Sequence, residues 1–408
     1  MAIINCGKIN IIFLIPIIGG LIRIIRNYAF NIINENKSDE ILKQIFLIFT
    51  NGFYMELGMV LAFIPYIILK YQTKKTVGSS DQTQSRKSRL TIKFEYYDIY
   101  EKNRKSKYKL ICFATFLDFS RTFLLYPFHS ECPYNIWEFD LLYLSLLSYI
   151  ILKTKLYRHQ YFSMIIIIIL GFGLNVITYF KNTNDKIDVI QIIVKLISEL
   201  ILSLNIVVNK YIMDKYFCSP YELCMLEGII IVLLSVFCIS IIIIINVING
   251  NITNVDFISL LGLDKPFLYA IVMIITFFYN ISIFVTNEKF SPCHVLLALI
   301  VHECYYYVNT DMEGKIIIIL NIIGLLILIV MLIIFLFFIE IIELNIFNIS
   351  RNTKKNIGIR ANRDNDYISE SSDDEEDENE NDNDEPVVDT QSLSSILTHN
   401  TTQNENEN

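Results

Sequence analysis

The stretch VIQIIVKLISELILSLNIVVNKY, residues 189–211, decides the fold class of this chain. It is long enough to cross the hydrocarbon core of a bilayer, which takes about 20 predominantly apolar residues in a helix. It lacks the strict alternation of apolar and polar residues that marks a strand of a membrane barrel. Because hydrocarbon offers no hydrogen-bond partners to the backbone, the stretch is predicted to be a transmembrane helix.

Similar stretches recur over the first 345 residues and predict an all-α, polytopic membrane protein with about ten transmembrane helices. The expected spans are Ile9–Tyr28, Ile45–Leu69, Tyr108–Phe128, Trp137–Leu152, Tyr161–Phe180, Val189–Tyr211, Tyr221–Ile245, Phe267–Val285, Ser291–Val308 and Ile316–Ile342. The first contains Arg23 and Arg26, so it is either a retained helix or a signal-like segment. The lipid bilayer is the first expected partner.

The basic residues between the spans give the orientation. With the amino terminus in the cytosol, the cytosolic segments hold 22 Lys and Arg residues and the opposite segments hold 6. Eleven of the 22 lie between Lys70 and Lys107, in a polar stretch read as a flexible cytosolic loop over residues 71–107. An excess of this kind follows the positive-inside rule and predicts that both termini are cytosolic. The loop shows no nucleic-acid-binding motif, so no nucleic-acid partner is expected.

An even number of spans divides into two five-helix halves, residues 1–180 and 188–345. An odd number of helices in each half makes the two halves inverted in the membrane, as in many secondary carriers. Residues 346–408 form a tail that holds sixteen acidic residues after Arg363 and too little apolar surface to fold. We therefore expect a disordered, cytosolic, acidic tail.

The eight cysteines show neither CxxC nor zinc spacing, so neither a metal site nor a cofactor is expected. The five histidines form no pair at metal or general-base spacing, so no catalytic residue is assigned. Two glycosylation sequons, at Asn36 and Asn251, fall on the non-cytosolic side. Two helix starts on the cytosolic side, Ser219-Pro220 and Ser291-Pro292, carry a serine cap before proline, and Glu222 would complete a capping box.

Ionisable residues at membrane depth are the candidate site, because each charge left in lipid costs about 2.5–3.5 kcal/mol. They must face one another or water, or be neutralised. Asp118 with Arg121, and Lys195 with Glu199, have the spacing of pairs within one helix. The set is Glu56, Asp118, Arg121, Lys195, Glu199, Glu227, His302 and Glu303.

The sixth span also carries a polar stripe. Its members fall in one angular sector at 100° per residue, with Glu199 on the flank. The stripe either lines a water-filled path or makes hydrogen bonds that join helices. His302 is read either as a proton-coupling group or as a satisfied core histidine. The stripe comprises Gln191, Lys195, Ser198, Asn205 and Asn209.

Several short segments resemble the drug/metabolite transporter superfamily, in its nucleotide-sugar-transporter-like, EamA-type branch. Glu56 in Tyr54-Met55-Glu56-Leu57-Gly58 resembles the acidic second helix of that branch, and Asp118 resembles the aspartate of its third helix. Residues 152–161, followed by Gly171 and Gly173, are similar to its basic turn between helices four and five. Glu227-Gly228 resembles the Glu-Gly of helix seven.

The resemblance implies a central site surrounded by helices one to four and six to nine, with helices five and ten peripheral. It also implies an endomembrane location, in the Golgi, the endoplasmic reticulum or a vacuole, rather than the plasma membrane. Lys195 with Glu199 matches no motif of the family, and no substrate-reading motif of the nucleotide-sugar carriers is present.

These observations predict a carrier, not an enzyme, that moves a small polar or anionic metabolite by alternating access, as an exchanger or with proton coupling. Nucleotide-sugar-like substrates lie within that class, and a homodimer stays open. The alternatives are a receptor or scaffold that signals through the acidic tail, and a membrane-embedded enzyme.

Overall fold

The computed structural model describes residues 4–5, 14–33, 41–79, 105–125, 128, 132, 136–181, 189–248, 265–308, 315–340 and 343–344. All of them belong to one compact unit, Met1–Lys354. The acidic tail over 346–408 and the sequons at Asn36 and Asn251 lie outside the described residues.

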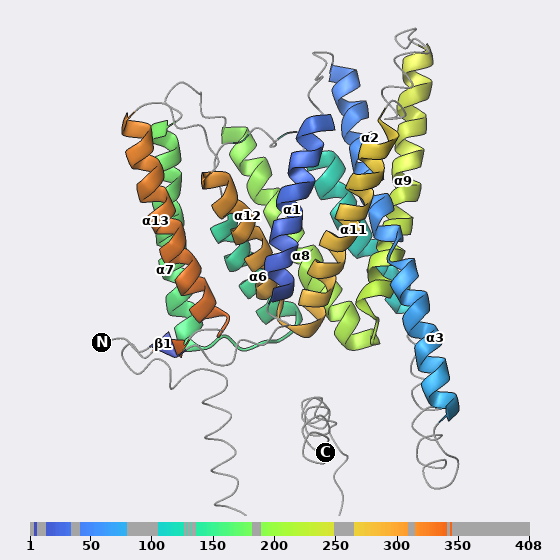
Figure 1. The fold of residues 1–408 in the computed structure, drawn as a ribbon, viewed down its shortest axis with the longest axis horizontal. Helices are drawn as coiled ribbons and strands as arrows, with labels where there is room; N and C mark the ends of the chain where they lie inside the picture. The colour runs from blue at the N-terminus through green and yellow to red at the C-terminus, as the bar shows by residue number, and fades with distance from the viewer. Residues whose placement is uncertain are drawn as a thin grey trace, which may run out of the picture. The chain divides into compact units, whose positions relative to one another are not determined.

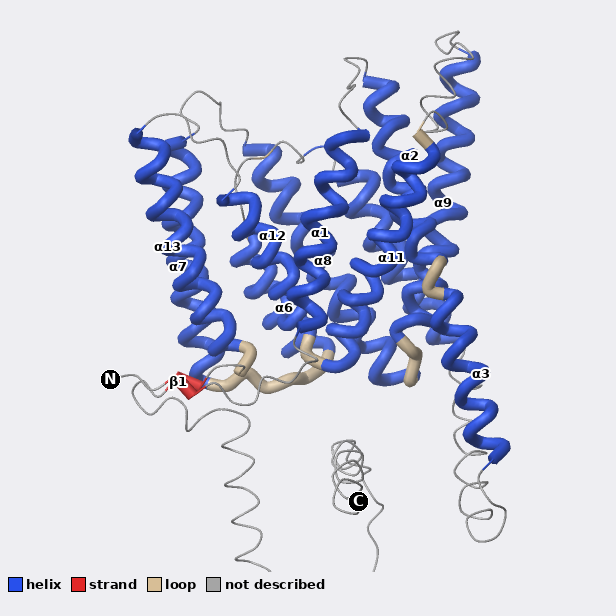
Figure 2. Tube along the Cα trace, viewed as in Figure 1, coloured by secondary structure: helices blue, strands red, loops and turns tan. Residues whose placement is uncertain are grey.

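The described part is a bundle of helices with one two-residue strand pair (Figures 1 and 2). A helix over residues 105–119 continues without a break into the π-helix η3 (Ser120–Leu125). The other helices are α1 (Leu14–Ile33), α2 (Ile41–Val60), α3 (Phe63–Ser79), α6 (Trp137–Ile151), α7 (Arg158–Lys181), α8 (Val189–Tyr216), α9 (Pro220–Ile248), α11 (Pro266–Lys289), the 3₁₀-helix η4 (Pro292–Val295), α12 (Leu296–Val308) and α13 (Lys315–Phe338).

Six helical segments among the described residues are long and apolar enough to cross a membrane. This confirms the prediction of a helical, multi-pass membrane protein. A shorter apolar helix covers Pro292–His302. The six segments are Leu47–Tyr71, Arg158–Phe180, Val189–Tyr216, Pro220–Ile245, Pro266–Lys289 and Ile318–Phe338.

The first of these segments is broken between α2 and α3. Residues 61 and 62 form a turn in which the amides of Leu61 and Ala62 bond to carbonyls three residues earlier. Pro65 has no N–H to offer the carbonyl of Leu61, so the regular α-helical ladder cannot run through this position. The helix then resumes and reaches Ser79, so the segment expected to be a loop over 71–107 is helical at both of its ends.

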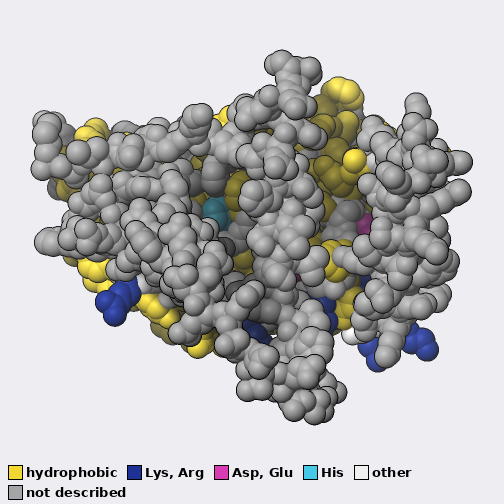
Figure 3. All heavy atoms as spheres, turned by 90° about the horizontal axis from the view of Figure 1, so that it is seen from below, with side chains coloured by type: hydrophobic (Ala, Val, Ile, Leu, Met, Phe, Trp, Pro, Cys, Tyr) yellow, Lys and Arg dark blue, Asp and Glu magenta, His cyan; other side chains and the backbone are white. Residues whose placement is uncertain are grey.

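The turns 152–157, 217–219 and 290–291 gather at one end of the bundle, which we call the basic end (Figure 1). Described basic residues there include Lys153, Lys155 and Arg158, and Lys and Arg side chains are visible on this face (Figure 3). Strands β1 (Ile4–Asn5) and β2 (Glu343–Leu344) pair antiparallel, so the start of the chain lies beside the segment that follows α13.

The two predicted serine caps behave differently. Ser219 accepts a hydrogen bond from the Glu222 amide at 3.1 Å, as expected, but the Glu222 side chain is engaged by Lys107. Ser291 precedes a short 3₁₀-helix and caps no amide, because its hydroxyl contacts His294 Nδ1 at 2.8 Å.

Glycines allow the closest helix contacts. A Cβ on Gly58 of α2 would lie 2.5 Å from the Met273 carbonyl oxygen of α11. A Cβ on Gly228 of α9 would lie 2.7 Å from Met59 Cβ of α2. Small residues at helix contacts bring backbones together in membranes, where no hydrophobic force drives helices to associate. Gly58 and Gly228 therefore set the distances of α2 from α11 and α9.

Gly58→Ala should lower the free energy of unfolding in detergent by about 1–3 kcal/mol, because the new methyl group meets a backbone oxygen that cannot rotate away. Gly173→Ala is the matched control, since a Cβ there meets nothing within 4 Å and alanine is the better helix former. Thermal unfolding of both purified variants measures the effect. Equal loss of stability in both would contradict the assigned contact.

Candidate functional site

The C-terminal part of the polar stripe of α8 faces the interior of the bundle. Ser198, Asn205 and Asn209 are buried, whereas Gln191 and Lys195 are only half-buried. The Asn209 side-chain amide donates to Glu227 Oε2 of α9 at 3.4 Å. The stripe therefore leads to a carboxylate of the neighbouring helix.

Glu227 is 1% exposed and interacts electrostatically with Asp118 and Glu56. Glu56 of α2 is 5% exposed and interacts electrostatically with Asp118, Arg121 and Arg26. The predicted pair of Asp118 and Arg121 forms, with 3.8 Å between Arg121 Nε and Asp118 Oδ1. Three carboxylates from three different helices thus come together, and two of them, Glu56 and Asp118, lie near guanidinium groups.

A second group of charges adjoins the first through Arg121. Asp140 of α6 is 2% exposed and interacts electrostatically with Glu199 of α8, Arg121 of η3 and Arg23 of α1. Arg121 lies in a π-helix, a distortion that is frequent at functional sites.

We call these residues the buried charge cluster. Its side chains come from α1, α2, α6, α8, α9 and the helix that ends in η3, and no single helix contains the site. Within the described part of the chain, Glu56 Oε2, Asp140 Oδ1 and Glu227 Oε1 are buried without a hydrogen-bond partner. The cluster comprises Arg23, Arg26, Glu56, Asp118, Arg121, Asp140, Glu199 and Glu227.

No protein-family model matches this chain, and no curated protein matches it in sequence. The buried charge cluster therefore has to be interpreted from its own geometry.

Three members of the cluster are not among the predicted site residues. Arg23 and Arg26 left the first span open to interpretation as a signal-like segment, and in α1 they supply two of the cluster's positive charges. Asp140 lies near the start of the expected span Trp137–Leu152, where a charge is ordinarily solvated. The signal for all three was present, because each is an ionisable residue within an apolar stretch.

The other predicted site residues lie on α8 and α12. His302 of α12 has its Nε2 2.8 Å from Asn27 Nδ2 of α1. Lys195 lies one turn before Glu199 on α8, and their pairing stays a prediction. Glu303 falls in α12, but its side chain lies outside the described residues. Across the described ranges, no group of three His, Cys, Asp or Glu residues is placed to hold a metal ion.

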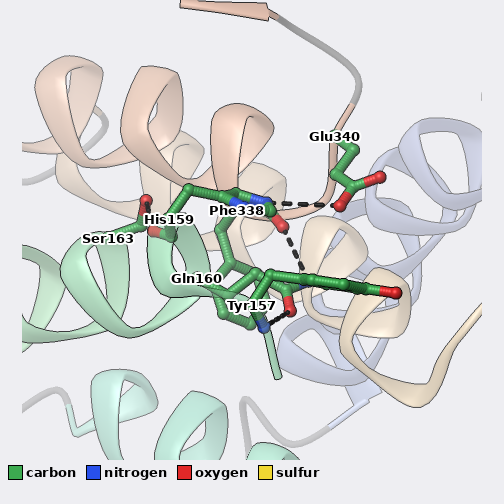
Figure 4. Close-up of polar contacts among 6 residues, drawn as sticks. All are labelled: Tyr157, His159, Gln160, Ser163, Phe338 and Glu340. Atoms are coloured by element: carbon green, nitrogen blue, oxygen red, sulfur yellow. Dashed lines mark hydrogen bonds and ion pairs between the residues drawn. The ribbon is translucent and has the colours of Figure 1, made fainter. Parts of the chain in front are cut away.

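A separate polar group joins the start of α7 to the end of α13 (Figure 4). The fully buried His159 has its Nε2 3.3 Å from Glu340 Oε1. Gln160 donates to the Phe338 carbonyl at 3.3 Å and accepts from the Tyr157 amide at 3.0 Å. Glu340 follows α13 with a φ of 62°, in the left-handed region, which turns the chain back toward His159. This group joins α7 to the end of α13 at the basic end, and these contacts include no member of the buried charge cluster.

Arg121→Gln should lower the free energy of unfolding by about 1–3 kcal/mol, because it leaves buried carboxylates without a shared positive charge. Arg121 is 32% exposed, so the loss should be smaller than for a fully buried pair. Arg158→Gln, at an exposed site of the basic end, is the control. A double-mutant cycle with Asp118→Asn, measured by chemical unfolding in detergent, should recover part of the loss. Strictly additive effects would show that the two side chains do not interact.

Proposed function

We propose that this protein is an alternating-access carrier, not an enzyme, that moves a small polar or anionic metabolite across a membrane, as an exchanger or with proton coupling. The observation that carries the proposal is the buried charge cluster, in which six helical segments of a membrane protein bring opposite charges together. A bundle that only needed to be stable would be served better by apolar side chains, since a buried ion pair rarely repays its desolvation. Charges kept at membrane depth therefore favour a transport path.

The architecture we propose is ten membrane passes in two inverted halves. The first half is α1, α2 with α3, the helix 105–125, α6 and α7, and the second is α8, α9, α11, α12 and α13. The helix contacts support a pseudo-twofold relation in which each helix of one half corresponds to a helix of the other, α1 to α8 for example. Thus α1 packs on α12 as α8 packs on α6, and α1 packs on α11 as α8 packs on η3. Likewise α6 meets α7 as α12 meets α13, while α2–α9 and α7–α13 are pairs of equivalent helices. Inverted repeats of this kind place substrate sites at the interface of the halves.

The basic end is proposed to be cytosolic, with both termini on that side. The positive-inside rule and the pairing of β1 with β2 at that end support this orientation. Membership of the drug/metabolite transporter superfamily and an endomembrane location are part of the proposal and rest on the resemblance of Glu56, Asp118 and Glu227 to that family's motifs.

The balance of charge bears on coupling. The cluster holds five carboxylates against three guanidinium groups, and a sixth carboxylate, the buried Glu138, also interacts electrostatically with Asp140. Lys195, one turn from Glu199, adds a further positive charge. Among the described residues of this site the carboxylates therefore outnumber the positive charges, and a proton is the simplest way to neutralise an excess negative charge at membrane depth. Arg23, Arg26 and Arg121 would meet the anionic or polar groups of the solute.

The proposed orientation predicts that Asn251 is glycosylated when the full chain is made in a eukaryotic membrane system. Asn251→Gln should then remove a glycan-dependent shift on a gel, and Asn36→Gln should do the same for its own site. Sequons inserted after Lys155 and after Ser219 are matched controls that should stay unmodified. A glycan on either control would reverse the orientation.

Transport itself is tested in two steps. A panel of metabolites is screened for thermal stabilisation of the purified protein, and the stabilising compounds are measured for uptake into liposomes. We expect saturable uptake that Lys195→Ala abolishes at normal expression, because the half-buried ammonium lies on the path, whereas Lys289→Ala at the exposed end of α11 leaves it intact. We expect Glu227→Gln to retain exchange but to lose uptake driven by a pH gradient.

Unchanged uptake in Lys195→Ala would remove that residue from the site. A panel in which no stabilising compound shows saturable uptake would contradict the carrier.

A further inference from the structure

In α8, α9 and α12 the described buried residues lie toward the basic end. In α8 the buried residues begin at Ser198 and continue to Tyr216 at the basic end, whereas Val189 to Ile197 contain none. In α9, which runs the other way, no described residue after Ile239 is buried. In α12 every residue from Val295, the last residue of η4, to Ile300 is buried next to the basic end. In these three helices the described buried side chains therefore gather toward the basic end, whereas in α11 Tyr269 and Val272 are buried near the opposite end.

An ion pair joins two helices at the basic end. Lys107, in the first turn of the helix 105–119, has its Nζ 2.7 Å from Glu222 Oε1 in the first turn of α9. Lys107 is 2% exposed and Glu222 is 19% exposed. Tyr216, the last residue of α8, donates its hydroxyl proton to Ser106 Oγ at 2.9 Å. The start of one helix is thus fastened to the turn between two others.

Apolar side chains fill the space behind this ion pair. Ile111, Ile212, Leu223 and Phe284 belong to one buried cluster that joins the helix 105–119 to α8, α9 and α11. Leu223 directly follows Glu222 in α9, and Glu227 lies one turn and a half farther along the same helix. We call these four apolar side chains the apolar barrier.

A second fastening joins α8 to α11. Lys210 donates to the Glu288 carbonyl at 2.8 Å and forms an ion pair with Asp214 at 3.1 Å. The buried side-chain amide of Asn287 donates to the Ile206 carbonyl at 2.8 Å. These bonds hold α8 against α11, so the movable contact at this end is the one between the helix 105–119 and the α8–α9 turn.

We propose that the Lys107–Glu222 ion pair is the latch of a gate at the basic end, and that the structure is the state in which this gate is closed. The proposal rests on the carrier function proposed above. A buried ammonium and carboxylate are stable either paired in a dry site or separated and hydrated, so the pair has two discrete arrangements. Opening would separate the helix 105–119 from the α8–α9 turn and expose the apolar barrier to water.

Cys218 provides a reporter that needs no substrate. It lies in the α8–α9 turn, is 3% exposed, and is a free thiol beside the latch. Burial, together with the Glu222 carboxylate, raises the pKa of the Cys218 thiol to about 12, while Lys107 acts in the opposite direction. Because the thiolate is the reactive form, labelling in the closed state should be slow.

The test measures the rate at which a small maleimide labels Cys218 in the purified full chain, with every other cysteine replaced by serine. Lys107→Met should raise that rate by roughly 10-fold, as a gate whose open state is a minor one becomes populated. The sign is informative, because loss of the Lys107 charge without opening would raise the pKa of Cys218 further and slow the labelling. Lys109→Met, an exposed site in the same helix, should leave the rate unchanged.

The exchanged double variant Lys107→Glu with Glu222→Lys should restore slow labelling, because it rebuilds the pair with its charges reversed. A rate in Lys107→Met equal to or below that of the parent, in protein with an unchanged elution profile and melting temperature, would overturn the latch. Should Lys107→Met fail to fold, Tyr216→Phe removes only the hydroxyl that holds Ser106, and an unchanged rate in that variant overturns the proposal as well.

The gate and the carrier can fail separately. Faster labelling in Lys107→Met together with no saturable uptake of any panel compound would retain the latch and reject the carrier. Normal uptake that depends on Lys195, with labelling unaffected by Lys107, would retain the carrier and reject the latch.

Discussion

The whole structure depends on the inability of hydrocarbon to solvate a charge or an unpaired backbone amide. The backbone answers this constraint by forming helices, whose hydrogen bonds are internal. The ionisable side chains meet one another instead: Glu56, Asp118 and Asp140 lie near arginines from α1 and η3, and Glu227 interacts with Glu56 and Asp118. Convergence of this kind requires that several helices be held at fixed rotations and depths.

Close contacts of backbone fix those positions. Gly58 and Gly228 place α2 against α11 and α9 at distances that a side chain would prevent. The same contacts bring Glu56 and Glu227, which lie two residues and one residue before these glycines, to the interior of the bundle. Packing and electrostatics are therefore coupled in this protein, since the residues that let the helices approach are neighbours of the residues whose charges must be compensated.

The two ends of the bundle differ in a way that the proposed carrier would use. At the basic end, polar bonds such as Lys107–Glu222 lie beside a buried apolar cluster, and the described parts of α8 and α9 at the opposite end are more exposed. An arrangement closed on one side and loose on the other is one of the two states that alternating access requires. The His159–Glu340 contact, which fastens α7 to α13, lies apart from this movement.

The sequence alone determined that the chain is helical and membrane-embedded, because length and apolar composition suffice to set that outcome. It also singled out Glu56, Asp118, Arg121 and Glu227, since a charge within an apolar stretch needs a partner wherever it lies. Only the tertiary structure decided which partners these are. Arg23, Arg26 and Asp140 join the cluster, and Lys107, expected in a flexible loop, is buried against Glu222. These contacts join residues far apart in the chain, so they depend on helix rotation and depth, which periodicity within one segment does not contain.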